Sequence, residues 1–143
     1  MAIRNVLIRM LAVGLVFLVG MTLSLAQNEA NPPDSEGMLL VQAVMCETVE
    51  ETLPIHPAVV FSIQIGRVSC YSTFDSISEK TVIFHKWYHQ DNLSTQKKLT
   101  LRPPRWSSYS SIQLRETDKG PWRVDITDEK GVLLAKLRFS VTD

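Results

Sequence analysis

The feature that most constrains this chain is the recurrence of an apolar side chain at every second position near its C-terminus. Between residues 122 and 127, and again between residues 133 and 141, every second side chain is apolar. Because side chains of a β-strand point alternately to opposite faces, this period of two predicts two strands that each bury one face. The segment 128–131 between them ends in Gly131, which supplies the positive φ that a tight turn requires. The two runs therefore predict a β-hairpin.

Five further segments have the composition or the alternation of strands. They span residues 39–49, 67–74, 81–89, 97–101 and 106–114. The segment 81–89 is apolar on both faces, as expected of a central strand, and Pro54 and Pro57 are expected to break the chain after the first strand. These short strands, with no amphipathic helix between them, predict an all-β fold: a small antiparallel two-sheet sandwich of the immunoglobulin or fibronectin kind.

The N-terminus has the three parts of a secretory signal peptide. Arg4 and Arg9 stand without any acidic residue, an apolar run covers residues 10–23, and residues 24–26 read Ser-Leu-Ala. This pattern predicts an N-terminal signal-peptide helix in residues 1–26, cleavage after Ala26, and a periplasmic or secreted protein. An uncleaved membrane anchor is the alternative, because the apolar run is only a little shorter than a bilayer span.

The rest of the chain divides into a linker and a domain. Residues 27–37 are polar, contain two prolines and have no apolar periodicity, so we interpret them as a linker. Residues 38–143 form the sandwich domain. Loss of residues 1–26 leaves 13 basic against 15 acidic residues, a net charge of about −2. Such a balance provides no field that attracts polyanions, so nucleic acid is not an expected partner.

Cys46 and Cys70 are the only cysteines. In an oxidising compartment, an even pair within one small domain predicts a structural disulfide. In its expected strand, each cysteine lies on the same face as apolar residues. Both side chains are therefore expected to face the core. A bridge closing this loop is expected to contribute about 3 kcal/mol.

Several motifs of the domain resemble those of a known family. They are the segments 68–72 (Val-Ser-Cys-Tyr-Ser), 85–88 (His-Lys-Trp-Tyr), Arg105-Trp106 and 120–124 (Gly-Pro-Trp-Arg-Val). Through them the chain from about Val44 to Val141 resembles the bacterial family catalogued as domain of unknown function 2914. The resemblance implies an extracytoplasmic module, and it brings no activity, ligand or catalytic residue. The chain departs from the family pattern just after Val49.

Few residues suggest catalysis or metal binding. His85 and His89 are four residues apart, but on a strand that places their Cα atoms about 13 Å apart, too far to share one ion easily. The chain has no GxSxG motif, and its acidic residues cluster at turns, where local hydrogen bonds explain them. We therefore expect no metal, no cofactor and no enzyme activity.

The aromatic and cationic residues are the remaining candidates for binding: His85, Trp87, His89, Arg105 and Trp106. One interpretation buries Trp87 beside Cys46 and Cys70, enclosed by Trp122, Ile126, Leu137 and Phe139. The other exposes His85, Trp87 and His89 as a row that stacks on sugar rings or on a partner's side chains.

The sequence thus favours a non-catalytic interaction module of the bacterial cell envelope, whose partner is a protein or a glycan. Contact with the membrane is expected only if the N-terminal segment is retained. The alternative is a small envelope enzyme or metal-dependent hydrolase that uses His85 with a neighbouring acid.

Overall fold

The computed structural model describes residues 37–143. The predicted signal peptide, and the linker up to residue 36, lie outside the described residues. Within the described part, no helix is long and apolar enough to cross a membrane.

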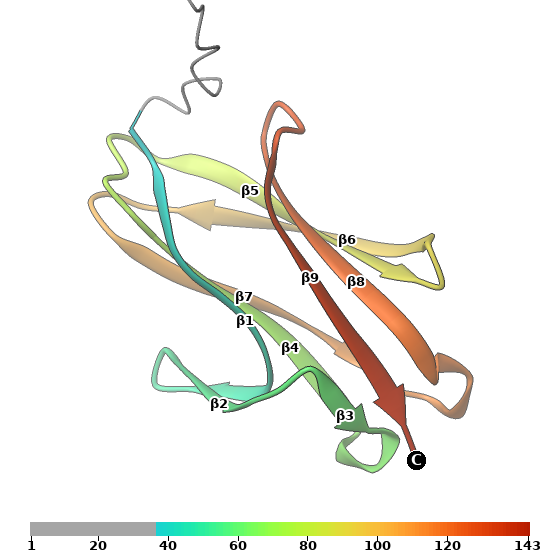
Figure 1. The fold of residues 1–143 in the computed structure, drawn as a ribbon. Helices are drawn as coiled ribbons and strands as arrows, with labels where there is room; N and C mark the ends of the chain where they lie inside the picture. The colour runs from blue at the N-terminus through green and yellow to red at the C-terminus, as the bar shows by residue number, and fades with distance from the viewer. Residues whose placement is uncertain (1–36) are drawn as a thin grey trace, which may run out of the picture. The chain divides into compact units, whose positions relative to one another are not determined.

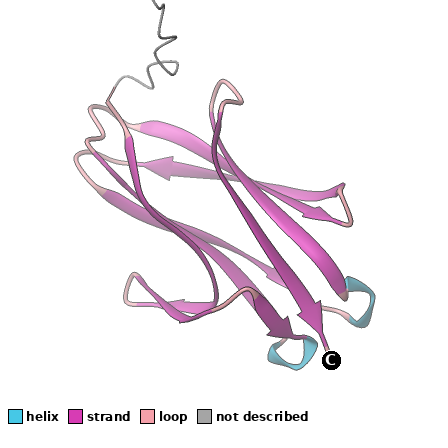
Figure 2. Cartoon of the chain, in the orientation of Figure 1, coloured by secondary structure: helices cyan, strands magenta, loops and turns pink. Residues whose placement is uncertain are grey.

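In the described residues nine strands form two sheets. Figures 1 and 2 show the two sheets facing each other. The four-stranded sheet has the order β2-β1-β4-β7 and the five-stranded sheet the order β3-β9-β8-β5-β6. All neighbouring strands are antiparallel except β3 and β9, which are parallel. The strands are β1 (Leu39–Glu50), β2 (Leu53–Pro57), β3 (Val60–Ser62), β4 (Arg67–Asp75), β5 (Thr81–His89), β6 (Asn92–Leu101), β7 (Trp106–Gln113), β8 (Gly120–Asp128) and β9 (Leu133–Thr142). The 3-10 turns η1 (Ile63–Ile65) and η2 (Glu116–Asp118) complete the part of the chain that the structure describes. The predicted two-sheet sandwich is confirmed.

The alternating runs near the C-terminus form the predicted hairpin, with Trp122 opposite Phe139 and Val124 opposite Leu137. Gly131 adopts a φ of 86°, and its N–H donates to the carbonyl of Asp128. The Asp128 carboxylate also accepts a hydrogen bond from the N–H of Val132 at 2.8 Å. Composition at this turn therefore sets the register of the hairpin.

The core lies between the two sheets and is centred on β5. Trp87 is completely buried, and its ring meets the ring of Phe139 edge-on at 6.1 Å. Phe139 in turn stacks on Trp122 at 6.0 Å, and Ile126 and Leu137 belong to the same apolar cluster. The predicted packing of Trp87 against the final hairpin is confirmed.

The predicted disulfide is wrong. Both thiols are free, because the residue opposite Cys70 is Met45 and not Cys46. Neighbours across a sheet share a face, so Met45 joins Cys70 in the core while Cys46 points to the other face. The cause is a bulge in β1 between Leu40 and Gln42, which reverses the parity of the residues that follow it.

Candidate functional site

His85 and Trp87 do not form an exposed row. Both side chains are completely buried. The Trp87 indole N–H donates to Ser110 Oγ at 3.1 Å, and His85 bonds the same hydroxyl through Nδ1 at 2.8 Å. His85 Nε2 lies 3.3 Å from Ser72 Oγ. The interpretation of His85, Trp87 and His89 as a binding face is therefore wrong, because strand β5 turns the first two inward.

Burial sets the protonation of His85. It lowers the pKa of the imidazole from 6.5 to about 4, since a charged ring would lose its hydration without gaining an acidic partner. The hydrogen-bond partners of His85 are serine hydroxyls of β4 and β7, which a neutral imidazole satisfies. His85 thus stays neutral near pH 7 and has no access to a substrate in solvent.

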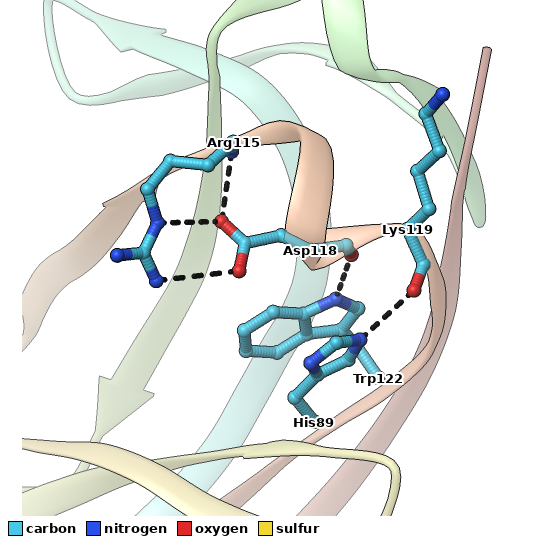
Figure 3. Close-up of polar contacts among 5 residues, drawn as sticks. All are labelled: His89, Arg115, Asp118, Lys119 and Trp122. Carbon is cyan, nitrogen blue, oxygen red and sulfur yellow. Dashed lines mark hydrogen bonds and ion pairs between the residues drawn. The ribbon is translucent and has the colours of Figure 1, made fainter.

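His89 belongs to the corner that joins β7 to β8, drawn in Figure 3. Its Nε2–H donates to the carbonyl of Lys119 at 2.9 Å, and its ring stacks on Trp122 at 4.5 Å. The indole N–H of Trp122 donates to the carbonyl of Asp118 at 2.7 Å. Two aromatic side chains therefore hold the backbone of η2 against the sandwich, which gives His89 a structural role.

The carboxylate of Asp118 stabilises the same corner. Burial opposes its charged form, but hydrogen bonds from the guanidinium and the backbone N–H of Arg115 outweigh burial and lower the pKa of Asp118. The Arg115 side chain is mostly exposed while the carboxylate is buried. The arrangement is a local cap of η2, in which the Asp118 carboxylate is buried and hydrogen-bonded to Arg115.

Arg105 and Trp106 lie at the start of β7, away from the β7–β8 corner. Arg105 pairs with Asp75 at 3.0 Å, and the guanidinium of Arg102 lies over the Trp106 ring at 5.9 Å. Trp106 keeps 39% of its surface exposed. The five residues selected from the sequence are therefore divided among the core, one corner and one strand end, and they form no common site.

The structure offers a different site where strand β1 of one sheet runs beside strand β9 of the other (Figure 1). On the side away from β4, β2 pairs with β1 only from Cys46 onward. On the side away from β8, β3 pairs with β9 only from Ser140 onward. The earlier part of each strand therefore has a free edge among the described residues.

The direction of individual peptide groups follows from two hydrogen bonds. Ser140 N–H donates to the carbonyl of Val59 at 2.9 Å, and Ala58 N–H donates to the carbonyl of Met45 at 3.1 Å. Peptide groups alternate in direction along a strand, so Arg138 and Lys136 direct their N–H and C=O groups to the same side as Ser140. These two residues of β9 thus present backbone donors and acceptors that no described strand pairs.

Between the two free edges lies an apolar groove of about 400 Å³. Its lining consists of residues 43–45 of β1, residues 57–59, and Leu137 and Arg138 of β9. Near it Val41, Val59 and Val60 are exposed by 46%, 68% and 56%. We call this groove with its two strand edges the open seam. Sequence reasoning missed it, because which strand edges are free depends on the pairing of distant segments.

A second hollow, of about 460 Å³, lies near the other end of β1. Glu47, Arg67 and Gln113 contribute polar groups to its lining. The lining includes the hydroxyl of Thr48 and the carboxylate of Glu47, but that carboxylate already accepts a hydrogen bond from His56 at 3.0 Å, and the lining residues include no imidazole base. The open seam has the stronger features of a binding site, because it joins apolar surface to unpaired backbone.

The fold and the site together define an antiparallel β-sandwich module with an apolar groove between two open strand edges. Comparison with known families finds a match for part of this module. Residues 80–141 match the family described as Protein of unknown function (DUF2914). The family resemblance is thereby confirmed for these residues, which contain almost all of β5 to β9. Residues 44–79, which our motif comparison included, lie outside the match. No curated protein matches the chain.

Proposed function

We propose that this domain is a non-catalytic, extracytoplasmic interaction module of the bacterial envelope, and that it binds an extended segment of a protein partner at the open seam. The observation that carries the proposal is the groove beside the unpaired backbone of Lys136 and Arg138. An added strand gains main-chain hydrogen bonds from such an edge, and its alternate side chains gain contacts from the apolar groove.

The other long edges of the sandwich fit this role less well. Strand β6 forms one edge of the five-stranded sheet and carries mostly polar and charged side chains, while β7 forms an edge of the four-stranded sheet and is rich in serine. The apolar groove adjoins β1 and β9 instead. Strand addition there buries apolar surface as well as forming hydrogen bonds, and apolar burial is the main source of favourable free energy.

A protein partner is favoured over a glycan at the open seam, because the described residues that line its groove include no aromatic ring. Trp87 is buried, Trp122 lies between His89 and Phe139, and Arg102 lies over Trp106. Binding of sugars by stacking needs an open aromatic face. Enzyme activity through His85 is also disfavoured, since its ring is enclosed and bonded to serines.

A peptide titration tests the proposal. We expect a peptide of alternating Val and Thr to shift the backbone amide resonances of Ala43, Lys136 and Arg138 in the domain spanning residues 38–143. A peptide of the same sequence with alternate amides N-methylated is the control, because it keeps the side chains but loses half of its main-chain donors. Equal binding of both peptides, or shifts confined to β6 or β7, would contradict strand addition at the seam.

A further inference from the structure

We infer that the segment bound at the open seam alternates apolar with acidic residues, its apolar side chains entering the groove and its carboxylates pairing with Lys136 and Arg138. The inference rests on the proposed function, and it goes further by giving the chemistry of the partner. It follows from the side-chain parity of β9 and from the distribution of charge on the outer face of the five-stranded sheet.

Side chains of β9 point alternately to the core and to solvent, so the two faces of an added strand meet different environments. Leu137 and Phe139 pack toward the core, whereas Lys136 and Arg138 are exposed on the opposite face of the strand. A strand paired to β9 continues the sheet, so its inward side chains enter the groove beside Leu137. Its outward side chains lie about 5 Å from those of Lys136 and Arg138, within reach of an ion pair.

The two cations have no carboxylate within 4 Å among the described residues. Asp125 lies opposite Lys136 in the register, but its carboxylate pairs with Arg123 at 3.1 Å. Arg123 also pairs with Asp91 at 2.8 Å, and its guanidinium lies over the Tyr88 ring at 4.1 Å. The acid opposite Lys136 is therefore already paired within its own strand.

The rest of the outer face adds positive charge. Lys86 of β5 lies opposite Asp125 on one side, as Lys136 does on the other. Lys98 of β6 lies opposite Phe84 on the same face. Like charges collected on one face repel each other, and an acidic ligand relieves that repulsion. This field favours an acidic partner.

A second copy of the chain is a poor occupant of the seam. Antiparallel pairing of β9 with β9 of another copy sets Lys136 and Arg138 against the same two cations, and like charges directly opposite are destabilising. The cations therefore protect this edge against self-pairing while leaving it open to acids. The occupant that fits the open seam is therefore an acidic segment of a different protein.

Three peptides of about eight residues test the inference on the folded domain: alternating Val and Glu, alternating Val and Thr, and alternating Val and Lys. We expect the Val/Glu peptide to bind about five- to tenfold more tightly than the Val/Thr peptide, and the Val/Lys peptide to bind more weakly still. Added salt should reduce the advantage of Val/Glu. Equal affinities for Val/Glu and Val/Thr would overturn the acidic preference and leave strand addition intact, whereas binding of none would overturn both.

Paired charge reversals locate the effect. The variant carrying Lys136→Glu and Arg138→Glu should reverse the order of the Val/Glu and Val/Lys peptides. The matched control, Lys86→Glu with Lys98→Glu, makes the same charge change two and three strands away and should preserve the order. An equal effect of both variants would overturn the pairing with β9. Tight binding of alginate would overturn it as well, because alginate carries carboxylates but has no peptide backbone that could form a strand. Thermal melts verify that each variant is folded, and the salt dependence in the unmodified domain tests the inference without any variant.

Discussion

Lowering the pH from 7 to 5 should destabilise the domain through His85. The ring is completely buried, and burial lowers its pKa from 6.5 to about 4. Because the unfolded chain binds the proton more tightly, the stability contributed by the neutral ring is complete above about pH 6.5 and is lost as the pH falls toward 4. The full loss corresponds to about 3 kcal/mol, of which about 2 kcal/mol falls between pH 7 and pH 5.

Urea unfolding of the isolated domain at pH 7, 6 and 5 measures this loss directly. A His85→Gln variant keeps hydrogen-bonding groups near Ser72 and Ser110 but cannot titrate, so its unfolding free energy should change much less over the same range. His56 is exposed and hydrogen-bonds Glu47, and a His56→Gln variant, which removes a surface histidine instead, shows how much of the pH dependence belongs to His85. Parallel pH profiles for His85→Gln and the unmodified domain would refute the reasoning.

Three further predictions concern stability and the thiols. Trp87→Ala should lower the unfolding free energy by about 3 to 5 kcal/mol, measured by urea unfolding, because it leaves a cavity in the centre of the core; an unchanged midpoint would mean that the ring is not buried. Asp118→Asn should cost about 1 to 2 kcal/mol at pH 7 by the same assay and progressively less as the pH falls below 4, because the lowered pKa of Asp118 makes its contribution present above pH 4 and lost as the carboxylate is protonated; a cost that does not change with pH would contradict this. Cys46 and Cys70 should both react with an alkylating agent in denaturant without reductant, as mass spectrometry can determine, and a single protected pair would instead indicate a bridge.

The sequence predicted most of the fold, because strand identity in this domain is a local property. Alternation alone located the final hairpin, and the apolar composition on both faces of residues 81–89 identified β5 as a central strand. The short strands β2 and β3 were missed. Pro54 and Pro57 argued against a strand, yet β2 lies at the edge of its sheet, where proline is tolerated.

The errors arose where distant segments decide the outcome. The bulge in β1 moves Cys46 off the core parity, and the neighbouring residues contain no glycine or proline that would indicate it. Sequence reasoning assigned no particular role to Ser110, but Ser110 is buried as the partner of His85 and Trp87. The open seam depends on which edges remain unpaired, a property that no single segment encodes.

The most direct test of the account is the detection of cross-strand contacts between a bound peptide and β9. Nuclear Overhauser effects should connect the amide protons of Lys136 and Arg138 with backbone protons of the Val/Glu peptide, and inward valines of the peptide should contact Ala43 and Leu137. Contacts to the edges of β6 or β7 alone, or a bound peptide without ordered backbone contacts to β9, would contradict the claim that the open seam binds an extended protein segment.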